Sequence, residues 1–364
     1  MNDAKLKAWL CLKYAPGLSL RNSLELLRIY PKPQEFVGNP EHELFGMDKL
    51  GSATAEHLKN AVLPERVDHI LQLCQSHDIS YLCYTDADYP PALQGIFPPP
   101  LILYYKGDLH AALQGFCLAV VGTRKPSAYG VEMCRRLVAP VCEQGVCIVS
   151  GLAMGIDTIA HQTALSCKSK TIAVLAHGLD IVYPPGNKTL ADKIVHNGAV
   201  VSEYDPGAKP DRWNFSDRNR IISALSQAVL IVEAPFDSGA LLTANFARQQ
   251  ARPVYALPGN INHLNAQGPN KLIREGACII TCAEDLMNDL GLGSSAEEQL
   301  ILLPEMNEDE QKLYDIVTGK NGEISFDELL LHTGLSFGKL STILLNLELK
   351  GVIAKSSGNS FIRV

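Results

Sequence analysis

The sequence lacks any apolar run of the roughly 18 residues that a membrane-spanning helix needs. Its opening stretch, MNDAKLKAWLCLKYAPGL, has no long apolar core of the kind found in signal peptides. The ten cysteines are scattered, and no CxxC pair or Cys/His cluster has the spacing of a zinc site. We therefore expect a cytoplasmic protein that is neither exported nor inserted in a membrane, with no metal and no cofactor.

The chain also lacks an excess of basic residues, because 32 Lys and Arg stand against 39 Asp and Glu, a net charge of −7. Residues 84–290 hold 17 basic and 18 acidic side chains, whereas residues 305–364 hold six and nine. This balance argues against a broad basic face for nucleic acid. It still permits a local site where basic side chains converge on one edge of the domain.

What the sequence does contain is a series of apolar runs, each about one strand long and each followed by a glycine-containing turn. Helical segments separate these runs, a pattern typical of an α/β fold with a parallel sheet covered by helices. Ligands of such sheets bind where the carboxyl ends of the strands meet. These runs are VVG (120–122), VCIVSG (146–151), TIAVLAHG (171–178), AVLIVEA (228–234) and PVYALPG (253–259).

The first turn, VVGTRKPS, has the features of a phosphate site. Gly122 lets backbone N–H groups approach an anion, and a helix predicted from about Tyr129 points its positive end at the same place. Arg124 follows at once, and its planar guanidinium suits a phosphate. The alternative is an ordinary turn with a solvated arginine.

Eight segments in this order resemble the core motifs of the DprA/Smf family of DNA-processing proteins. The resemblance covers roughly the whole chain, and eight motifs in register are far more specific than any one glycine-rich turn. The segments are VGTRKPSAYG, SGLAMGID, GLDIVYPPGN, SEYDPG, NRIISALS, VEA followed by SGALLTA, ALPGNI and NKLIREGA.

This resemblance implies an extended Rossmann-like domain that binds single-stranded DNA without cutting it. It further implies that the protein protects the strand and helps to load the RecA recombinase past single-strand-binding protein, as in natural transformation. A homodimer formed through the Rossmann-like domain is the expected assembly.

We divide the chain into four parts. Residues 1–83 form a helical domain, 84–290 the extended Rossmann-like DNA-binding domain, 291–303 a linker, and 304–364 a winged-helix-like domain. In the first part, APGLSLRNSLELLRIY and GMDKLGSATAEHLKNA resemble helix-hairpin-helix units, yet neither turn carries basic residues. We therefore favour a helical module that packs on the core or on a protein partner.

The last part reads as three helices and a hairpin with a Ser-Gly-Asn turn. Its third helix offers only Lys339 and Lys350 as bases, too few for the phosphate contacts that duplex DNA needs. We expect a protein-interaction or regulatory module. The helix also has apolar residues spaced for core packing, namely Leu340, Ile343, Leu344 and Leu347.

The resemblance implies that Arg124 matches the family's essential arginine. It also implies that Lys188 stands where the family has a basic residue in contact with DNA; the alternative is that Lys188 is only solvated. Asn219 and Arg220 match the family's Asn-Arg pair, and Arg220 either binds phosphate or pairs with Glu203 or Glu233. Ser127 either donates a hydrogen bond to DNA or starts a helix. The predicted DNA- and phosphate-binding residues are Gly122, Thr123, Arg124, Ser127, Gly151, Gly155, Gly178, Lys188, Asn219, Arg220 and Gly239.

Two aromatic residues, Tyr183 and Phe215, are candidates for base stacking, and core packing is the alternative. Asp157, Glu203 and Glu233 look like catalytic carboxylates, but no nucleophile, His base or metal set accompanies them. We read these three acids as caps and turn locks.

Two other classes of function remain open. The core also resembles, more distantly, the phosphoribohydrolases related to lysine-decarboxylase-like proteins, whose PGGxGTxxE motif carries a glutamate that takes part in glycosidic cleavage. Here the segment is DSGALLTANFA, with Ala244 and Asn245 where the acid would stand. GTRKPS is likewise not the GxGxxG of a dehydrogenase, so we expect no enzyme and no catalytic residue. A protein-interaction hub with a vestigial anion pocket is the second alternative.

Overall fold

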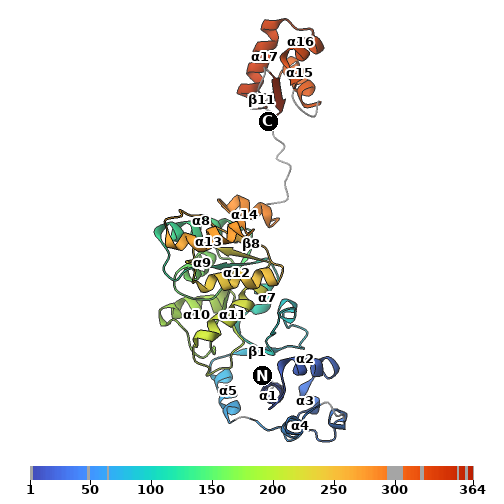
Figure 1. The fold of residues 1–364 in the computed structure, drawn as a ribbon, viewed down its shortest axis with the longest axis vertical. Helices are drawn as coiled ribbons and strands as arrows, with labels where there is room; N and C mark the ends of the chain where they lie inside the picture. Colours follow the sequence, from blue (N-terminus) through green and yellow to red (C-terminus); the bar gives the residue numbers. More distant parts are fainter. Residues whose placement is uncertain are drawn as a thin grey trace. The chain divides into compact units, whose positions relative to one another are not determined.

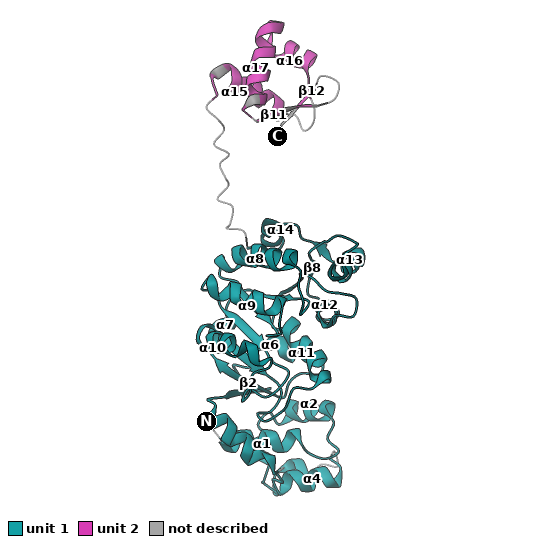
Figure 2. Ribbon diagram, turned by 90° about the vertical axis from the view of Figure 1, so that its left-hand side faces the viewer, with its two compact units in different colours: residues 1–293 teal, residues 294–364 magenta. Residues whose placement is uncertain are grey.

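The computed structural model describes residues 3–46, 50–63, 65–292, 306–319, 324–350, 352–356 and 360–363. These residues form two compact units, residues 1–293 and 294–364, coloured separately in Figure 2. In the described part of the chain, no helix is both long enough and apolar enough to cross a membrane. The predicted linker 291–303 lies outside the described residues from 293 onward, as does the predicted turn at 357–359.

A sheet forms the centre of the first unit (Figure 1). It has nine strands in the order β1-β2-β6-β5-β4-β3-β7-β8-β9. In the part of this order from β6 through β3 to β9, all neighbouring strands run parallel, which confirms the predicted α/β fold. Strands β1 and β2 add an antiparallel edge that we did not predict. The strands are β1 (Ser80–Cys83), β2 (Ile102–Gly107), β3 (Cys117–Val121), β4 (Cys147–Ser150), β5 (Thr171–Val174), β6 (Ala199–Ser202), β7 (Ala228–Ile231), β8 (Val254–Ala256) and β9 (Cys278–Ile279).

Every residue of the five strands β3 to β7 is buried, so these strands are apolar on both faces. Alternation along β3 sends Leu118 and Val120 into one apolar cluster and Ala119 and Val121 into another. Helices α8 (Ala128–Glu143), α9 (Ile156–Ser166) and α14 (Ala283–Asp289) cover the first face. On the second lie α7 (Leu109–Leu113), α11 (Arg212–Ala224), α12 (Gly239–Gln249) and α13 (Gln267–Arg274).

The N-terminal helices pack on this sheet and share its compact unit. One buried cluster joins Trp9 and Leu71 to Ala173 of β5 and Val200 of β6, and α10 (Lys188–Asn197) also contributes to it. Strand β1, which we had placed in the helical domain, belongs to the sheet, so the sheet begins before residue 84. The helices are α1 (Asp3–Lys13), α2 (Leu20–Ile29), α3 (Pro33–Phe36), α4 (Ser52–Lys59) and α5 (Arg66–Ser76).

Asp205, just after β6, fastens the helical module to the core. Its carboxylate accepts hydrogen bonds from Lys13 Nζ (2.7 Å), Tyr104 Oη (2.9 Å) and the Tyr14 hydroxyl. Burial by itself would raise the Asp205 pKa, but Lys13 and the two hydroxyls outweigh it and lower the pKa below its usual value. The module therefore holds the loop that follows β6.

The second unit is a winged helix. It contains α15 (Glu308–Gly319), α16 (Phe326–Thr333) and α17 (Phe337–Leu349), with an antiparallel sheet of β10 (Ile324–Ser325), β12 (Ser360–Arg363) and β11 (Ile353–Ser356). The four apolar residues predicted for its core, Leu340, Ile343, Leu344 and Leu347, are buried.

Both lysines of the third helix of the winged helix are in ion pairs with α15. Lys339 Nζ lies 2.7 Å from Asp309 Oδ2, and Lys350 Nζ lies 2.7 Å from Glu310 Oε2. Their charges are thus partly neutralised within the unit.

Candidate functional site

Strand β3 is the topological switch point of the parallel sheet. The chain passes from β3 to β4 on one side, whereas β7 and then β8 extend the sheet on the other. At such a point the loops after adjacent strands diverge and leave a crevice at the carboxyl edge. The loops after β3 and β7 are joined here by a hydrogen bond from Thr123 N to the Glu233 carbonyl, 2.6 Å long.

A cleft of about 440 Å³ opens at this switch point. The loop after β3, the middle of α11 and the first turn of α12 form its walls. It brings together five of the predicted residues, namely Gly122, Thr123, Arg124, Asn219 and Gly239. Its lining also includes Lys125, Phe215, Arg218, Ser238 and Asn265, together with the acidic Asp157.

Arg124 is exposed in this cleft, and its guanidinium lies 5.5 Å from the centre of the Phe215 ring. Among the residues that the structure describes, no carboxylate lies within 4.0 Å of it. A cation without an internal counter-ion, stacked on an aromatic ring, is well placed to receive an anion.

Gly155 supports the Arg124 loop from behind. It has φ 85°, which favours glycine, and a Cβ built there would collide with the Thr123 carbonyl and lie 2.8 Å from Arg124 Cα. Only a glycine lets the start of α9 approach the loop so closely. Gly155 therefore shapes the site without lining the cleft.

Arg218 is the main residue that sequence reasoning missed. It is 5% exposed and donates from Nη1 to the Gly151 carbonyl (2.9 Å) and to the Val174 carbonyl, and from Nε to Asn219 Oδ1 (3.2 Å). A Cβ at Gly151 would lie 2.5 Å from the Arg218 guanidinium, so this glycine makes room for the arginine.

Burial lowers the Arg218 pKa to about 10, so the group stays charged at neutral pH and places a positive charge in the cleft wall. An arginine in a helix normally indicates a solvent-facing position. The sequence signal that could have indicated a buried Arg218 is the run IISA shortly after it, because the helix is buried continuously from Arg218 to Ala224.

Asn219 links α11 to the start of α12. Its Nδ2 donates to the Gly239 carbonyl over 3.0 Å, and the Ser238 hydroxyl accepts from Ala240 N at the first turn. Beside Gly239, a Cβ would meet only Asn219 Nδ2, at 4.0 Å, so this side of the helix start is open. The positive end of α12 thus faces the cleft.

Residues 80–291 match the family model described as DNA recombination-mediator protein A, and residues 302–359 match the DprA winged helix domain. The chain belongs to the DprA/Smf family. It is 36% identical over 323 residues to Protein Smf of Synechocystis, which covers 79% of this chain and 81% of the relative.

Two solved structures of the DprA/Smf family resemble this one. DNA processing protein A of Streptococcus pneumoniae aligns with a TM-score of 0.67 at 32% identity, over 79% of this chain and 98% of that one. The protein from Helicobacter pylori aligns with a TM-score of 0.54 at 32% identity, over 58% and 95%. The Helicobacter structure is described as giving insight into that protein's unique mode of single-stranded DNA binding.

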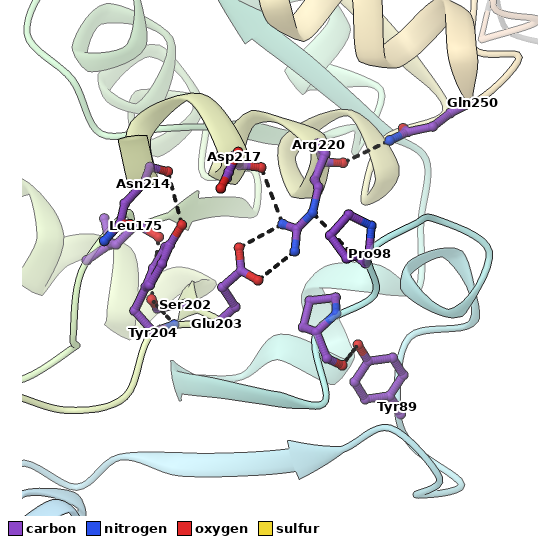
Figure 3. Close-up of polar contacts among 11 residues, drawn as sticks. Tyr89, Pro98, Leu175, Ser202, Glu203, Tyr204, Asn214, Asp217, Arg220 and Gln250 are labelled. Carbon is purple, nitrogen blue, oxygen red and sulfur yellow. Dashed lines mark hydrogen bonds and ion pairs between the residues drawn. The ribbon is translucent and has the colours of Figure 1, made fainter. Parts of the chain in front are cut away.

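Arg220 is not among the residues that line the cleft of this DprA/Smf protein. Its ion pair with Glu203 is drawn in Figure 3. Its guanidinium is bound to both oxygens of Glu203, at 2.7 and 2.6 Å, and its Nε donates to the Pro98 carbonyl over 3.0 Å. Of the alternatives for Arg220, the structure shows the ion pair with Glu203. We therefore remove Arg220 from the predicted DNA contacts.

Ser127 and Gly178 also have roles inside the fold. The Ser127 hydroxyl donates to Glu233 Oε1 over 2.6 Å and accepts from Gly130 N at the start of α8. A Cβ at Gly178 would lie 2.7 Å from the Asp205 carbonyl, so this glycine serves a tight turn. Lys188 is exposed at the first position of α10 and is not among the residues that line the cleft.

The three acids are held by the fold as well. Asp157 accepts from Gly151 N (3.1 Å) and Ala153 N (3.4 Å), and Glu233 accepts from the backbone and hydroxyl of Ser127. Within the described ranges, no group of three or more His, Cys, Asp or Glu is placed to hold a metal ion. These contacts fit caps and turn locks better than acid-base chemistry.

Proposed function

We propose that this protein binds single-stranded DNA in the cleft at the carboxyl edge of its sheet, without cutting it. The observation that carries the proposal is the exposed Arg124 guanidinium beside Phe215 at the switch point. A guanidinium suits a phosphodiester and an aromatic ring suits a base, so the pair can hold one nucleotide by both ends. The single-stranded DNA bound by the Helicobacter relative supports the same ligand here.

We further propose that the bound strand is protected in the cytoplasm and passed to the RecA recombinase, against competition from single-strand-binding protein. A homodimer through the Rossmann-like domain is the proposed assembly. Family membership supports these steps. They are tested by RecA ATP hydrolysis on DNA coated with single-strand-binding protein, which should start sooner when this protein is added. An unchanged lag would refute the loading role.

The binding site is tested by titrating a fluorescent oligothymidylate with wild-type protein and with Arg124→Glu. We expect Arg124→Glu to weaken binding by about tenfold or more, that is ~1.4 kcal/mol. Lys168→Glu is the matched control, because it makes the same change of charge at an exposed residue in the loop before β5, at the opposite edge of the sheet. Equal affinities for wild type and Arg124→Glu would show that Arg124 is not part of the DNA-binding site.

The same titration tests the mode of binding. Because phosphate contacts release counter-ions, single-strand affinity should fall with salt at a slope of about −0.7 per contact, and Arg124→Ala should remove one such contact. Duplex should bind more weakly, since a cleft at a sheet edge admits a flexible strand more easily than a rigid helix. The oligonucleotide should be recovered intact; cleavage would favour an enzyme instead.

A further inference from the structure

A separate cavity of about 360 Å³ lies at the carboxyl ends of β7 and β8. It shares no lining residue with the cleft that holds Arg124. Asn265, which lines that cleft, joins the two sites, because its Nδ2 donates to the Lys125 carbonyl (3.0 Å) and to Glu233 Oε2 (3.3 Å). We call this space the Tyr129 cavity; its lining includes Tyr129, Glu233, Leu257, Asn260 and His263.

Glu233 contributes a buried carboxylate to the Tyr129 cavity. It is 5% exposed, and among the described residues no Lys, Arg or His nitrogen lies within 4.0 Å of its oxygens. Oε2 accepts from Ser127 N (2.8 Å) and from Asn265, whereas Oε1 accepts from Ser127 Oγ alone (2.6 Å). Because each carboxylate oxygen has about two acceptor sites, Oε1 can accept one more hydrogen bond, from a ligand.

Tyr129 gives the cavity an aromatic wall. It is 48% exposed, and its hydroxyl donates to the Pro258 carbonyl over 3.0 Å, which ties the start of α8 to the loop after β8. Burial and, to a smaller extent, the charge of Glu233 raise the Tyr129 pKa, so the hydroxyl keeps this proton at neutral pH. The buried Val232 and Leu257 also line the cavity. It therefore offers apolar contact to a flat ring.

Asn260 and His263 are exposed polar residues of the same lining. Asn260 Oδ1 accepts from Asn262 N over 3.0 Å, so the Nδ2 group is the one that remains to donate to a ligand. No Lys or Arg is among the described residues that line the cavity. Unlike the cleft with Arg124, this cavity therefore has no group that suits a phosphate.

We infer that the Tyr129 cavity binds a guanine base. Guanine is the one DNA base in which two donor groups, N1–H and the N2 amino group, stand side by side, so the Glu233 carboxylate would face no lone pair next to the donor it accepts from. The O6 and N7 atoms of guanine are acceptors and suit Asn260 and His263. The flat ring suits the wall formed by Tyr129.

This inference goes beyond the proposed function and does not depend on it, because the two sites have separate linings. The guanine has two possible sources, a free nucleoside or a base of the bound strand whose phosphates stay outside the cavity. Both present the same edge to Glu233, and the experiment distinguishes them.

The test begins with calorimetric titration of the full chain with the four deoxynucleosides. Deoxyguanosine should bind about tenfold or more tightly than the other three. Tyr129→Ala should weaken its binding by about tenfold, because a ring contact is lost, and Tyr129→Phe should restore most of the affinity. Phe97→Ala is the matched control, since Phe97 is 72% exposed and does not line the cavity.

Glu233→Gln removes the charge of the carboxylate and should abolish the preference for deoxyguanosine. Because Glu233 also holds Ser127, thermal unfolding must show that this variant is folded. The Tyr129 variants test the cavity independently of that outcome, since they leave the Ser127 contacts in place. A Tyr129→Ala protein that binds deoxyguanosine as tightly as wild type would refute the inference.

The source of the base is tested with two oligothymidylates of about 12 nucleotides, one of which carries a single central deoxyguanosine. A gain in affinity from this base that Tyr129→Ala removes identifies the strand as the source. Binding of deoxyguanosine with no difference between the two strands identifies a free nucleoside.

Failure of this inference is distinguishable from failure of the proposed function. Equal or undetectable binding of the four deoxynucleosides, together with equal affinity for the two strands, overturns the guanine site. The proposed function still stands in that case if Arg124→Glu weakens oligothymidylate binding. Conversely, a protein that binds deoxyguanosine but no oligothymidylate retains the guanine site and loses the proposed function.

Discussion

His161 and Thr171 share a buried hydrogen bond of 2.7 Å between Nδ1 and Oγ1. The Thr171 hydroxyl donates its one proton to the Ile148 carbonyl, also over 2.7 Å, so it accepts from His161. The Nδ1 atom therefore carries the imidazole proton and Nε2 carries none. Nε2 is buried without a partner in the described part of the chain. Burial, with a smaller effect of Arg218, lowers the His161 pKa to about 3.

This pair predicts a loss of stability in mild acid. As the pH falls below about 6.5, His161 takes up a proton in the unfolded chain but not in the folded one, so protonation favours unfolding. Its contribution to the free energy of unfolding should fall by about 1.4 kcal/mol per pH unit between about pH 6 and pH 4. Urea unfolding at pH 7, 6 and 5 measures the trend.

His161→Asn is the variant to compare, because an amide can still donate to Thr171 but does not titrate. We expect wild type to lose more stability than this variant between pH 7 and pH 5. Parallel pH profiles for the two proteins would show that His161 is not responsible.

The Arg220–Glu203 pair should matter for folding and not for DNA binding. Arg220→Ala leaves the mostly buried Glu203 carboxylate unpaired, and breaking a buried pair in this way costs about 3–5 kcal/mol. The control is Arg136→Ala, which breaks an exposed pair with Glu132 and should cost about 0–1 kcal/mol. Chemical denaturation measures both. A stable Arg220→Ala protein that has lost oligonucleotide affinity would return Arg220 to the site.

Gly155→Ala should move the Arg124 loop. Gly155 (φ 85°) and Gly145 (φ 79°) both have positive φ, and alanine at either strains the backbone by about 1–3 kcal/mol. A Cβ at Gly145 meets nothing within 4 Å, whereas at Gly155 it collides with the Thr123 carbonyl. We therefore expect a larger loss of stability for Gly155→Ala than for Gly145→Ala, and a drop of about tenfold in oligonucleotide affinity for Gly155→Ala alone. Equal affinities in the two variants would contradict the supporting role of Gly155.

Deleting residues 305–364 should leave oligonucleotide affinity within a few-fold of wild type. The winged helix has its own apolar core, and Lys339 and Lys350 are already paired with Asp309 and Glu310. The remaining chain keeps the cleft intact. We expect the deletion to impair RecA loading, measured by the lag in RecA ATP hydrolysis. A loss of affinity of about tenfold or more, ~1.4 kcal/mol, would mean that the module does bind DNA.

The central strands were predictable because burial on both faces makes them continuous apolar runs, as in the CLAVV of β3 and the AVLI of β7. Strand β1, at the edge of the sheet, escaped prediction because SYLC is only partly buried and is not a continuous apolar run. Strand β2 also escaped prediction, although its first three residues, Ile102 to Tyr104, are buried. The strand order was equally hidden, since it depends on which strands pair across long stretches of chain.

For the site, the sequence alone determined the family motifs and the turn that places Arg124 directly after a strand, because these depend on neighbours in the chain. Which of the other basic side chains lie near the cleft was decided by the tertiary structure. Arg218 is buried by the carbonyls of Gly151 and Val174, and Arg220 is held by Glu203. These partners lie 17 to 67 positions away, so only the packed sheet could assign one arginine to the cleft wall and the other to the interior.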